Sequence, residues 1–268
     1  MAEKDQKLAT RPANTQLAGR EPVPDYISRG HGMEQVQKSD IALPRLGLCQ
    51  AGSPQKKKSD PLFIKDLEEG QMFNTVTNKI YGTSLEVIPV LFGRSRIKFF
   101  PLDEGGGIHC QSLNGTDGGI LNPVCEKNGV PVCPHAQFTL DEGGDKHNPA
   151  CQFFHNRLVW LPDHYEIIVQ SFKSSGLKES RNWVGLSTLI GADLFAKRYR
   201  LDVVEIKKNT FSWFGMKVSP IAGWVPKDVY DFAKEQYESA ASKPIIMDTR
   251  DLGPEEDKRD DSFETAGM

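Results

Sequence analysis

The chain of 268 residues carries 33 Lys and Arg against 36 Asp and Glu, and its formal net charge is −3. Hydrophobic residues make up 38% of it, which is enough for one sizeable core. No run of 18 apolar residues is present, so the sequence excludes a membrane-spanning helix. The charge is uneven, because residues 41–247 sum to about +2 whereas residues 248–268 sum to −5. This distribution predicts a mildly basic body with an acidic tail.

The two ends of the chain are poor in core-forming side chains. Residues 1–40 are rich in Lys, Gln, Pro, Gly, Asp and Glu. Such a segment buries too little apolar surface to offset the entropy lost when its backbone is ordered. We therefore predict a disordered N-terminal arm over residues 1–40, a folded core over residues 41–247 and a disordered acidic tail over residues 248–268.

Between the ends, the spacing of apolar residues predicts mostly strands. Alternating or β-branched apolar runs cover residues 72–76, 86–92, 94–99, 156–161, 165–172, 199–206 and 210–218. Gly93 is expected to break the strand between the second and third of these runs. Helical spacing predicts one helix over about 176–195 and another from Pro226 to about residue 242. The expected fold class is mainly β, an oligonucleotide-binding-like small barrel or curved sheet with an inserted loop and a C-terminal helix.

The inserted loop is a glycine-rich stretch, residues 104–155, that holds four of the five cysteines within 42 residues. Thiolates and imidazoles can close a tetrahedral zinc shell, and the metal then supplies folding free energy to a loop that has little core of its own. We therefore expect a structural zinc. The predicted ligands are Cys110, Cys125, Cys133 and Cys151, with His135 as the alternative to one of them.

Other interpretations of the cysteines remain open. Ordinary reduced cysteines are the main alternative, because no Cys-x2-Cys pair is present. A catalytic zinc is disfavoured because no His-Glu-x-x-His motif appears. Disulfides are disfavoured by the odd cysteine count and by the lack of a signal peptide, so we expect a reducing, cytoplasmic compartment. Cys49 lies outside the cluster and is interpreted as a small buried hydrophobe.

Cations and aromatic residues alternate along several of the predicted elements. Single-stranded nucleic acid requires this combination, because cations contact the phosphates while unpaired bases stack on aromatic rings at about 1–3 kcal/mol each. Period-two spacing places three of the cations on one face of a strand. The residues predicted to contact phosphate are Arg94, Arg96, Lys98, Lys173, Lys178, Arg181, Lys197, Arg198 and Arg200. The residues predicted to stack on bases are Phe99, Phe100, Trp183, Trp213 and Phe214. Trp160 and Trp224 are assigned to the core.

Enzymatic motifs are missing from the sequence. It contains no Walker loop, no Gly-x-Gly-x-x-Gly, no Gly-x-Ser-x-Gly and no metalloprotease helix. Acidic pairs such as Asp103-Glu104 lie in glycine-rich turns, where carboxylates usually serve turn geometry. We therefore expect a protein that is not an enzyme.

The order of segments over about residues 41–242 resembles one known group of proteins. The segments are GQMFNTVTNKIYG, IHCQSLNG, VCPHAQF, PACQFFHNRLVW and SFKSSGLKESRNW. This succession is similar to bacteriophage single-stranded DNA-binding proteins in which a cysteine-bearing zinc insertion interrupts an oligonucleotide-binding-like core. In that group the middle ligands stand as Cys-x2-Cys-Pro, whereas seven residues separate Cys125 from Cys133 here.

The resemblance implies a protein of phage DNA replication and recombination in the host cytoplasm. It would bind single-stranded DNA without catalysis and with little sequence preference. Its acidic tail would recruit replication or recombination proteins through Asp260, Asp261 and Phe263, and would compete with DNA for the basic groove. One alternative is a protein-interaction adaptor or transcription co-factor that contacts RNA polymerase through the zinc loop and the tail. A structural virion component is the third possibility.

Overall fold

The computed structural model describes residues 43–101, 104, 106–144, 146–208, 210–241 and 245. The predicted N-terminal arm and acidic tail, with Asp260, Asp261 and Phe263, lie outside these residues. The mainly β prediction is confirmed, since strands form a large curved sheet, a small N-terminal sheet and a row of short hairpins. No helix among the described residues is long and apolar enough to cross a membrane.

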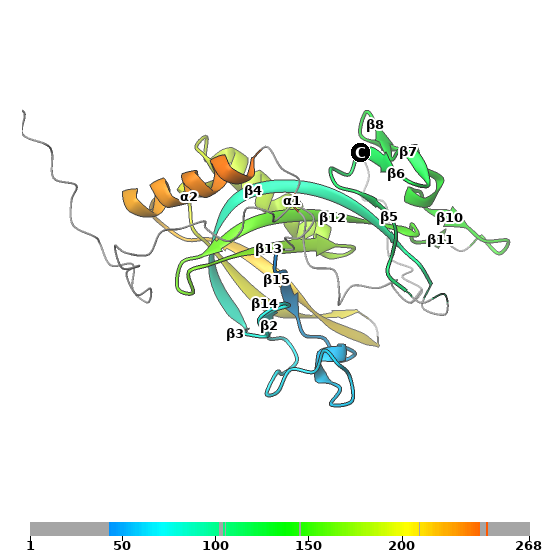
Figure 1. The fold of residues 1–268 in the computed structure, drawn as a ribbon, viewed down its shortest axis with the longest axis horizontal. Coiled ribbons are helices and arrows are strands. Elements are labelled where there is room, and N and C mark those ends of the chain that lie inside the picture. Colours follow the sequence, from blue (N-terminus) through cyan, green and yellow to red (C-terminus); the bar gives the residue numbers. More distant parts are fainter. Residues whose placement is uncertain are drawn as a thin grey trace, which may run out of the picture.

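The large sheet has six antiparallel strands in the order β13-β12-β4-β14-β15, with β5 also pairing with β4. The strands are β4 (Ser84–Phe99), β5 (Ile108–Ser112), β12 (Cys151–Leu161), β13 (Glu166–Lys173), β14 (Tyr199–Lys208) and β15 (Phe211–Pro220). β4 arches through the molecule (Figure 1). Its residues 84–87 pair with β14, residues 88–98 pair with β12, and residues 96–99 also pair with β5. No pairing joins β13 to β15 in the described chain, so the sheet does not close into a barrel.

β4 is continuous through Gly93, so the predicted break at this residue is wrong. Gly93 pairs with Asn156 in β12, and the ladder of strand contacts runs on to both sides of it. The lack of a side chain here leaves room for Ile245, whose Cδ1 would lie 3.2 Å from a Cβ atom on residue 93. The glycine therefore serves close packing and does not mark a turn.

Two helices cover opposite faces of the large sheet. α1 (Gly176–Leu189) packs through Trp183 on a core that includes Val159, Ile168 and Tyr199, whereas α2 (Lys227–Ala240) packs through Ala233 on the other core. α1 ends six residues before the predicted end, because Gly191 adopts φ +63° and a short 3-10 turn, η5 (Leu194–Ala196), follows. Both helices lie where the sequence predicts a helix.

The two tryptophans assigned to the core have different environments. Trp160 is buried as expected and packs on Phe232 of α2. Trp224 is 59% exposed, so its assignment to the core is wrong. Its indole instead faces solvent beneath the ammonium group of Lys197, which lies 3.8 Å from the ring centroid. Apolar neighbours in the sequence suggested burial, but the residue falls in the connection between β15 and α2.

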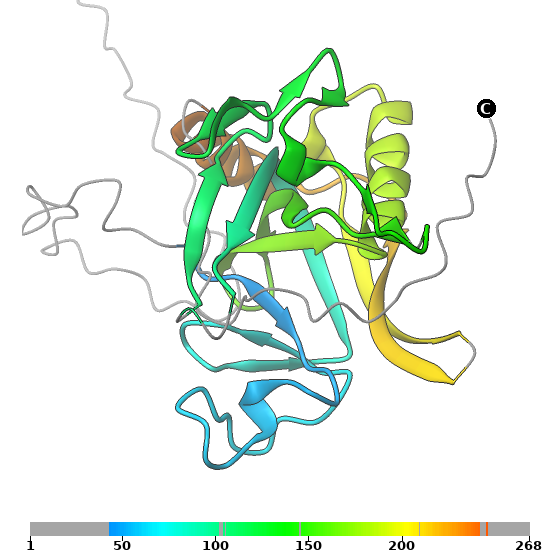
Figure 2. The same cartoon turned by 90° about the vertical axis from the view of Figure 1, so that its right-hand side faces the viewer.

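The N-terminal sheet lies beside the β14–β15 ribbon (Figures 1 and 2). Its strands are β1 (Leu46–Leu48), β2 (Met72–Asn74) and β3 (Ile80–Gly82), and the 3-10 turn η2 (Pro54–Lys56) lies between β1 and β2 in the chain. These four elements form the N-terminal lobe. Glu166 of β13 fastens it to the large sheet by accepting hydrogen bonds from Lys79, Tyr81 and Asn74. Cys49 is fully buried within this lobe beside Phe73, which confirms its interpretation as a small core residue.

The cysteine-rich insertion is called the cysteine arm below and comprises residues 104–150. After β5 it forms three short hairpins and one 3-10 turn (Figure 1). These are β6 (Asp117–Gly119) with β7 (Asn122–Val124), β8 (Glu126–Lys127) with β9 (Val130–Pro131), η4 (Pro134–Ala136), and β10 (Thr139–Leu140) with β11 (Lys146–His147). Few of its apolar side chains are buried, as the glycine-rich sequence predicts.

Candidate functional site

The three cations of β4 lie on one face, as the alternation of the sequence predicts. Arg94, Arg96 and Lys98 are each opposite a β12 residue on the same side of the sheet, and Lys98 is also opposite Cys110 of β5. This face is occupied by the cysteine arm. The prediction that these cations contact phosphate remains untested, but the structure gives two of them a different partner.

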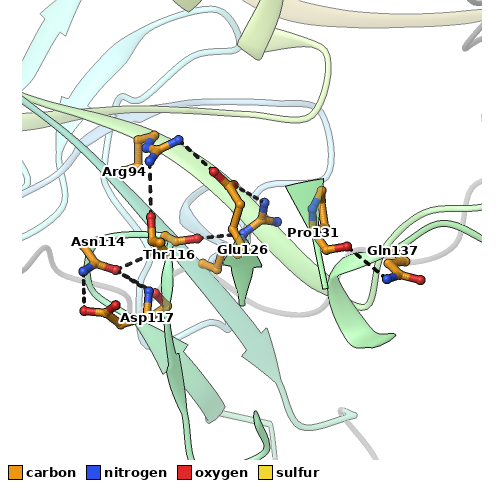
Figure 3. A network of polar contacts seen from close by, with 10 residues as sticks. Arg94, Asn114, Thr116, Asp117, Glu126, Pro131 and Gln137 are labelled. Atoms are coloured by element: carbon orange, nitrogen blue, oxygen red, sulfur yellow. Dashed lines mark hydrogen bonds and ion pairs between the residues drawn. The ribbon is translucent and has the colours of Figure 1, made fainter. Parts of the chain in front are cut away.

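That partner is Glu126 of the arm, which accepts hydrogen bonds from both arginines (Figure 3). The Arg94 Nη1 atom lies 3.2 Å from Glu126 Oε1, and the Arg96 Nη2 atom lies 3.1 Å from Oε2. Arg96 is buried, donates from Nε to the Gly115 carbonyl at 3.1 Å, and stacks its guanidinium over the Phe153 ring. The basic face of β4 therefore anchors the arm.

The fold brings the four predicted zinc ligands together and leaves Cys49 elsewhere. Cys110 and Cys151 flank Lys98 on the two neighbouring strands. The Cys133 amide donates to the Cys125 carbonyl at 3.3 Å, and Cys133 packs with Cys151 and Ala136 in a small core. Burial raises the pKa of Cys151 to about 12, and the other three thiols of the group act on it electrostatically.

These four side chains are not arranged as a complete metal-binding site. Within the described ranges, no group of three or more His, Cys, Asp and Glu is arranged to hold a metal ion. The donor chemistry, four thiols without a carboxylate among them, matches what zinc prefers. The alternative ligand His135 lies beside the cluster, with its Nδ1 atom 3.5 Å from Lys98 Nζ.

The largest concentration of predicted binding residues is at a pocket between β13 and β15. This basic pocket has a volume of about 740 Å3 and is lined by β1, η2, β13, the first turn of α1, and β15. Four predicted residues, Lys173, Lys178, Trp213 and Phe214, line it together. Other polar residues that the sequence did not single out also line it, among them Arg45, Gln50, Gln170 and Lys217.

A second pocket, of about 770 Å3, lies between β4 and the arm. Arg94 is the one cation among its lining residues, and that side chain already binds Glu126. The arm itself carries six Asp and Glu against two Lys, whereas residues 43–101 and 151–241 carry 21 Lys and Arg against 15 Asp and Glu. Positive charge is therefore concentrated on the body of the protein and not on the arm.

Two glutamines shape the edges of the basic pocket. The Gln50 side chain pairs with the backbone of β15, accepting from the Phe214 amide and donating to the Phe214 carbonyl, both at 2.8 Å. On the other side, Gln170 Nε2 donates to the Ser171 carbonyl at 3.1 Å. Side-chain amides thus occupy backbone groups that an added peptide strand would need.

A buried polar chain positions α1, whose first turn forms one wall of the pocket. Arg157 of β12 is almost fully enclosed and donates to both the hydroxyl and the carbonyl oxygen of Ser180. Arg157 donates a hydrogen bond to the Ser180 hydroxyl oxygen. The Ser180 O–H can therefore donate in turn to Nδ1 of His155, 2.9 Å away. Arg157 also stacks on Trp183, with 4.4 Å between its guanidinium carbon and the ring centroid.

His155, at the end of this hydrogen-bonded series of side chains, makes the stability of the fold dependent on pH. Burial, followed by the charges of Arg157, Arg181 and Arg94, lowers the pKa of His155 to about 4 from its ordinary 6.5. A histidine with a depressed folded pKa stabilises the fold above its unfolded pKa, and the stabilisation is lost as pH falls from 6.5 toward 4. We expect the free energy of unfolding to fall by about 2 kcal/mol from this group between pH 7 and pH 5.

Urea unfolding at both pH values measures this effect, with His155→Asn as the comparison. The variant should lose less stability than the natural chain on acidification, because Asn does not titrate. An equal loss of stability in both proteins would show that His155 is not responsible.

The remaining predicted binding residues are dispersed. Trp183 is fully buried and Phe99 is 5% exposed, so the prediction that they stack on bases is wrong, since neither ring has an open face. Phe100 stacks on His109, and Arg198 binds Glu86. Arg181 and Arg200 are exposed on the body, and Lys197 lies over Trp224.

Comparison with known proteins gives one result. A family model described as "Pam3 phage gp34-like protein" matches residues 14–245. Searches of curated proteins and of solved structures found no significant match. The family match therefore covers both the large sheet and the cysteine arm.

Proposed function

Because the chain belongs to the Pam3 phage gp34-like protein family, we propose that it is a phage protein that binds single-stranded DNA at the basic pocket. Binding would be non-catalytic and largely independent of sequence. Roles in replication and recombination, and recruitment of partners through residues 248–268, belong to the same proposal.

The observation that carries the proposal is that lysines and aromatic rings from three elements line the basic pocket together. Lys173 comes from β13, Lys178 from α1, and Trp213, Phe214 and Lys217 from β15. The phosphates of a DNA strand bind best where cations follow the backbone, and its unpaired bases stack on aromatic rings beside that backbone. The two glutamine caps argue against a peptide strand as the occupant, because peptide addition requires free strand edges.

Titration of a fluorescent oligo-dT tests this function. With the full chain at low salt we expect binding well below 10 µM, quenching of tryptophan fluorescence, and affinity that falls steeply as salt is raised, since each phosphate contact lowers the slope of log K against log salt by about 0.7. A Kd above about 10 µM at low salt would refute the proposal, because electrostatic attraction is then strongest.

A specific feature favours a second candidate function, the protein-interaction adaptor. The arm exposes large apolar side chains, with Ile120 82% and Leu140 70% exposed. Exposed apolar groups on an acidic arm suit contact with another protein. Failure of the oligo-dT titration would leave the adaptor as the better proposal.

Structural zinc in the arm is a further part of the proposal. Zinc would draw the thiols of Cys110, Cys125, Cys133 and Cys151 into a tetrahedral shell and hold a segment that has little core. Elemental analysis of the purified protein should find about one zinc per chain.

The variant Cys133→Ser should lose the zinc and expose the arm to proteolysis. Cys49→Ser is the matched control, because Cys49 is equally buried but lies in the N-terminal lobe. If the natural chain carries no metal, or if Cys133→Ser keeps it, the zinc proposal fails, whereas the DNA-binding proposal would stand.

A further inference from the structure

The first turn of α1 gives the basic pocket an end suited to an anion. Ser175 and Gly176 line the pocket, and the Ser175 side chain makes no capping hydrogen bond to the helix. The first N–H groups of a helix carry a partial positive charge and attract anions. Lys178 on this turn and Lys217 on β15 add full charges to the same pocket.

A second, independent feature lies in the pocket wall. Gln170 is 1% exposed, yet its Oε1 atom has no hydrogen-bond partner among the described residues. A buried polar atom left without a partner costs about 1–3 kcal/mol. Gln170 is also one of the residues that line the pocket, so a bound molecule that turns this side-chain amide toward it would supply the missing donor. Trp213 and Phe214 of β15 add aromatic surface to the same pocket.

The one acidic residue that lines the pocket is already engaged. Glu179 accepts a hydrogen bond from the Val218 amide of β15 at 2.7 Å and another from Asn182 at 3.2 Å. These contacts direct its carboxylate to β15 and tie α1 to that strand. Arg45 and three lysines line the pocket against this one carboxylate, so the lining keeps a net positive charge.

We propose that the basic pocket holds one complete nucleotide, with its phosphate at the first turn of α1 and its base against Gln170. The phosphate contacts are the α1 N–H groups, Lys178 and Lys217. The base lies among the aromatic rings and donates one N–H to Gln170 Oε1. Every DNA base has such a donor on its pairing edge, the exocyclic amine of adenine, cytosine and guanine or the ring N–H of thymine. The pocket thus accepts any base, in keeping with sequence-independent binding.

This inference rests on the proposed function and deepens it, since it assigns the two halves of one nucleotide to two ends of one pocket. It predicts that the basic pocket binds a free nucleotide that is not part of a DNA strand. It also predicts that neither half alone is sufficient, because each half would meet only one end of the pocket.

The test is calorimetric titration of the full chain at low salt with thymidine 5′-monophosphate, with thymidine and with inorganic phosphate. The nucleotide should bind at least about tenfold more tightly than either part. Lys178→Gln, an exposed position, should remove most of that preference without threatening the fold. Lys227→Gln, an equally exposed change on α2, should not alter it.

Each possible result has a definite meaning. Equal affinity for the nucleotide and for thymidine would overturn the phosphate end, and equal affinity for the nucleotide and for phosphate would overturn the base end. A protein that binds oligo-dT but not the nucleotide would overturn this inference and leave the proposed function intact. A protein that binds neither would overturn both.

Discussion

Replacing Glu126 by Ala is expected to destabilise the attachment of the cysteine arm by about 3–5 kcal/mol, because the change leaves the buried Arg96 without its carboxylate partner. The loss should be local, since Glu126 belongs to the arm while both arginines belong to β4. Amide hydrogen exchange of arm residues, with urea unfolding of the whole chain, would measure both effects. Faster exchange confined to the arm is the expected pattern.

Two further variants make this result interpretable. Glu205→Ala removes an exposed carboxylate that pairs with Lys207 and should cost less than about 1 kcal/mol. The double variant Arg96→Met with Glu126→Leu should recover much of the loss, because no buried charge remains and Met can pack on the Phe153 ring. If Glu126→Ala is no more harmful than Glu205→Ala, the ion pair does not anchor the arm.

The triple variant Lys173→Gln, Lys178→Gln and Lys217→Gln should weaken binding of oligo-dT by roughly 10³-fold at low salt. Each lysine that contacts a phosphate contributes about tenfold, because a charge-assisted hydrogen bond is worth about 1.5 kcal/mol or more. The slope of log K against log salt should become shallower by about 1.4, since about 0.7 is lost for each phosphate and Lys178 and Lys217 share one of them.

A control with the same change of charge separates pocket contacts from general attraction. Lys127→Gln, Lys227→Gln and Lys234→Gln remove three exposed lysines from the arm and α2, none of which lines the basic pocket. This protein should keep nearly all of its affinity. Equal weakening of the two triple variants would mean that net charge alone attracts DNA, and would remove the basic pocket from the proposal.

Some of the site could be predicted from local pattern. Period two placed Arg94, Arg96 and Lys98 on one face of a strand, and the register of β4 confirms that face. Clustering of thiols in a glycine-rich segment predicted one site for four of them; Cys110, Cys125 and Cys133 lie near enough to act electrostatically on Cys151, whereas Cys49 is buried elsewhere. These inferences depend on side-chain alternation and on spacing along the chain, which the sequence carries directly.

Exposure was harder to predict, because it depends on what packs against each face. Trp183 has Lys178 and Arg181 nearby in the sequence, but it also shares helical spacing with Leu186 and Ile190, and it lies with them in the core against Phe172 and Tyr199. Trp224 shows the reverse, with apolar neighbours but an open ring. Sequence pattern cannot distinguish a cation that faces solvent from one that faces another part of the chain.

The sequence by itself determined the mainly β class, the two helices, the four gathered cysteines and the basic face of β4. Tertiary structure alone decided what covers that face: the arm brings Glu126 onto Arg94 and Arg96 from about 30 residues away. It also decided that the strands of the described chain do not close into a barrel, and that the pocket between β13 and β15 collects Lys173, Lys178, Trp213 and Lys217. The physical reason is that strand alternation is a local property, whereas burial and pockets arise from contacts between distant segments whose pairing no short pattern specifies.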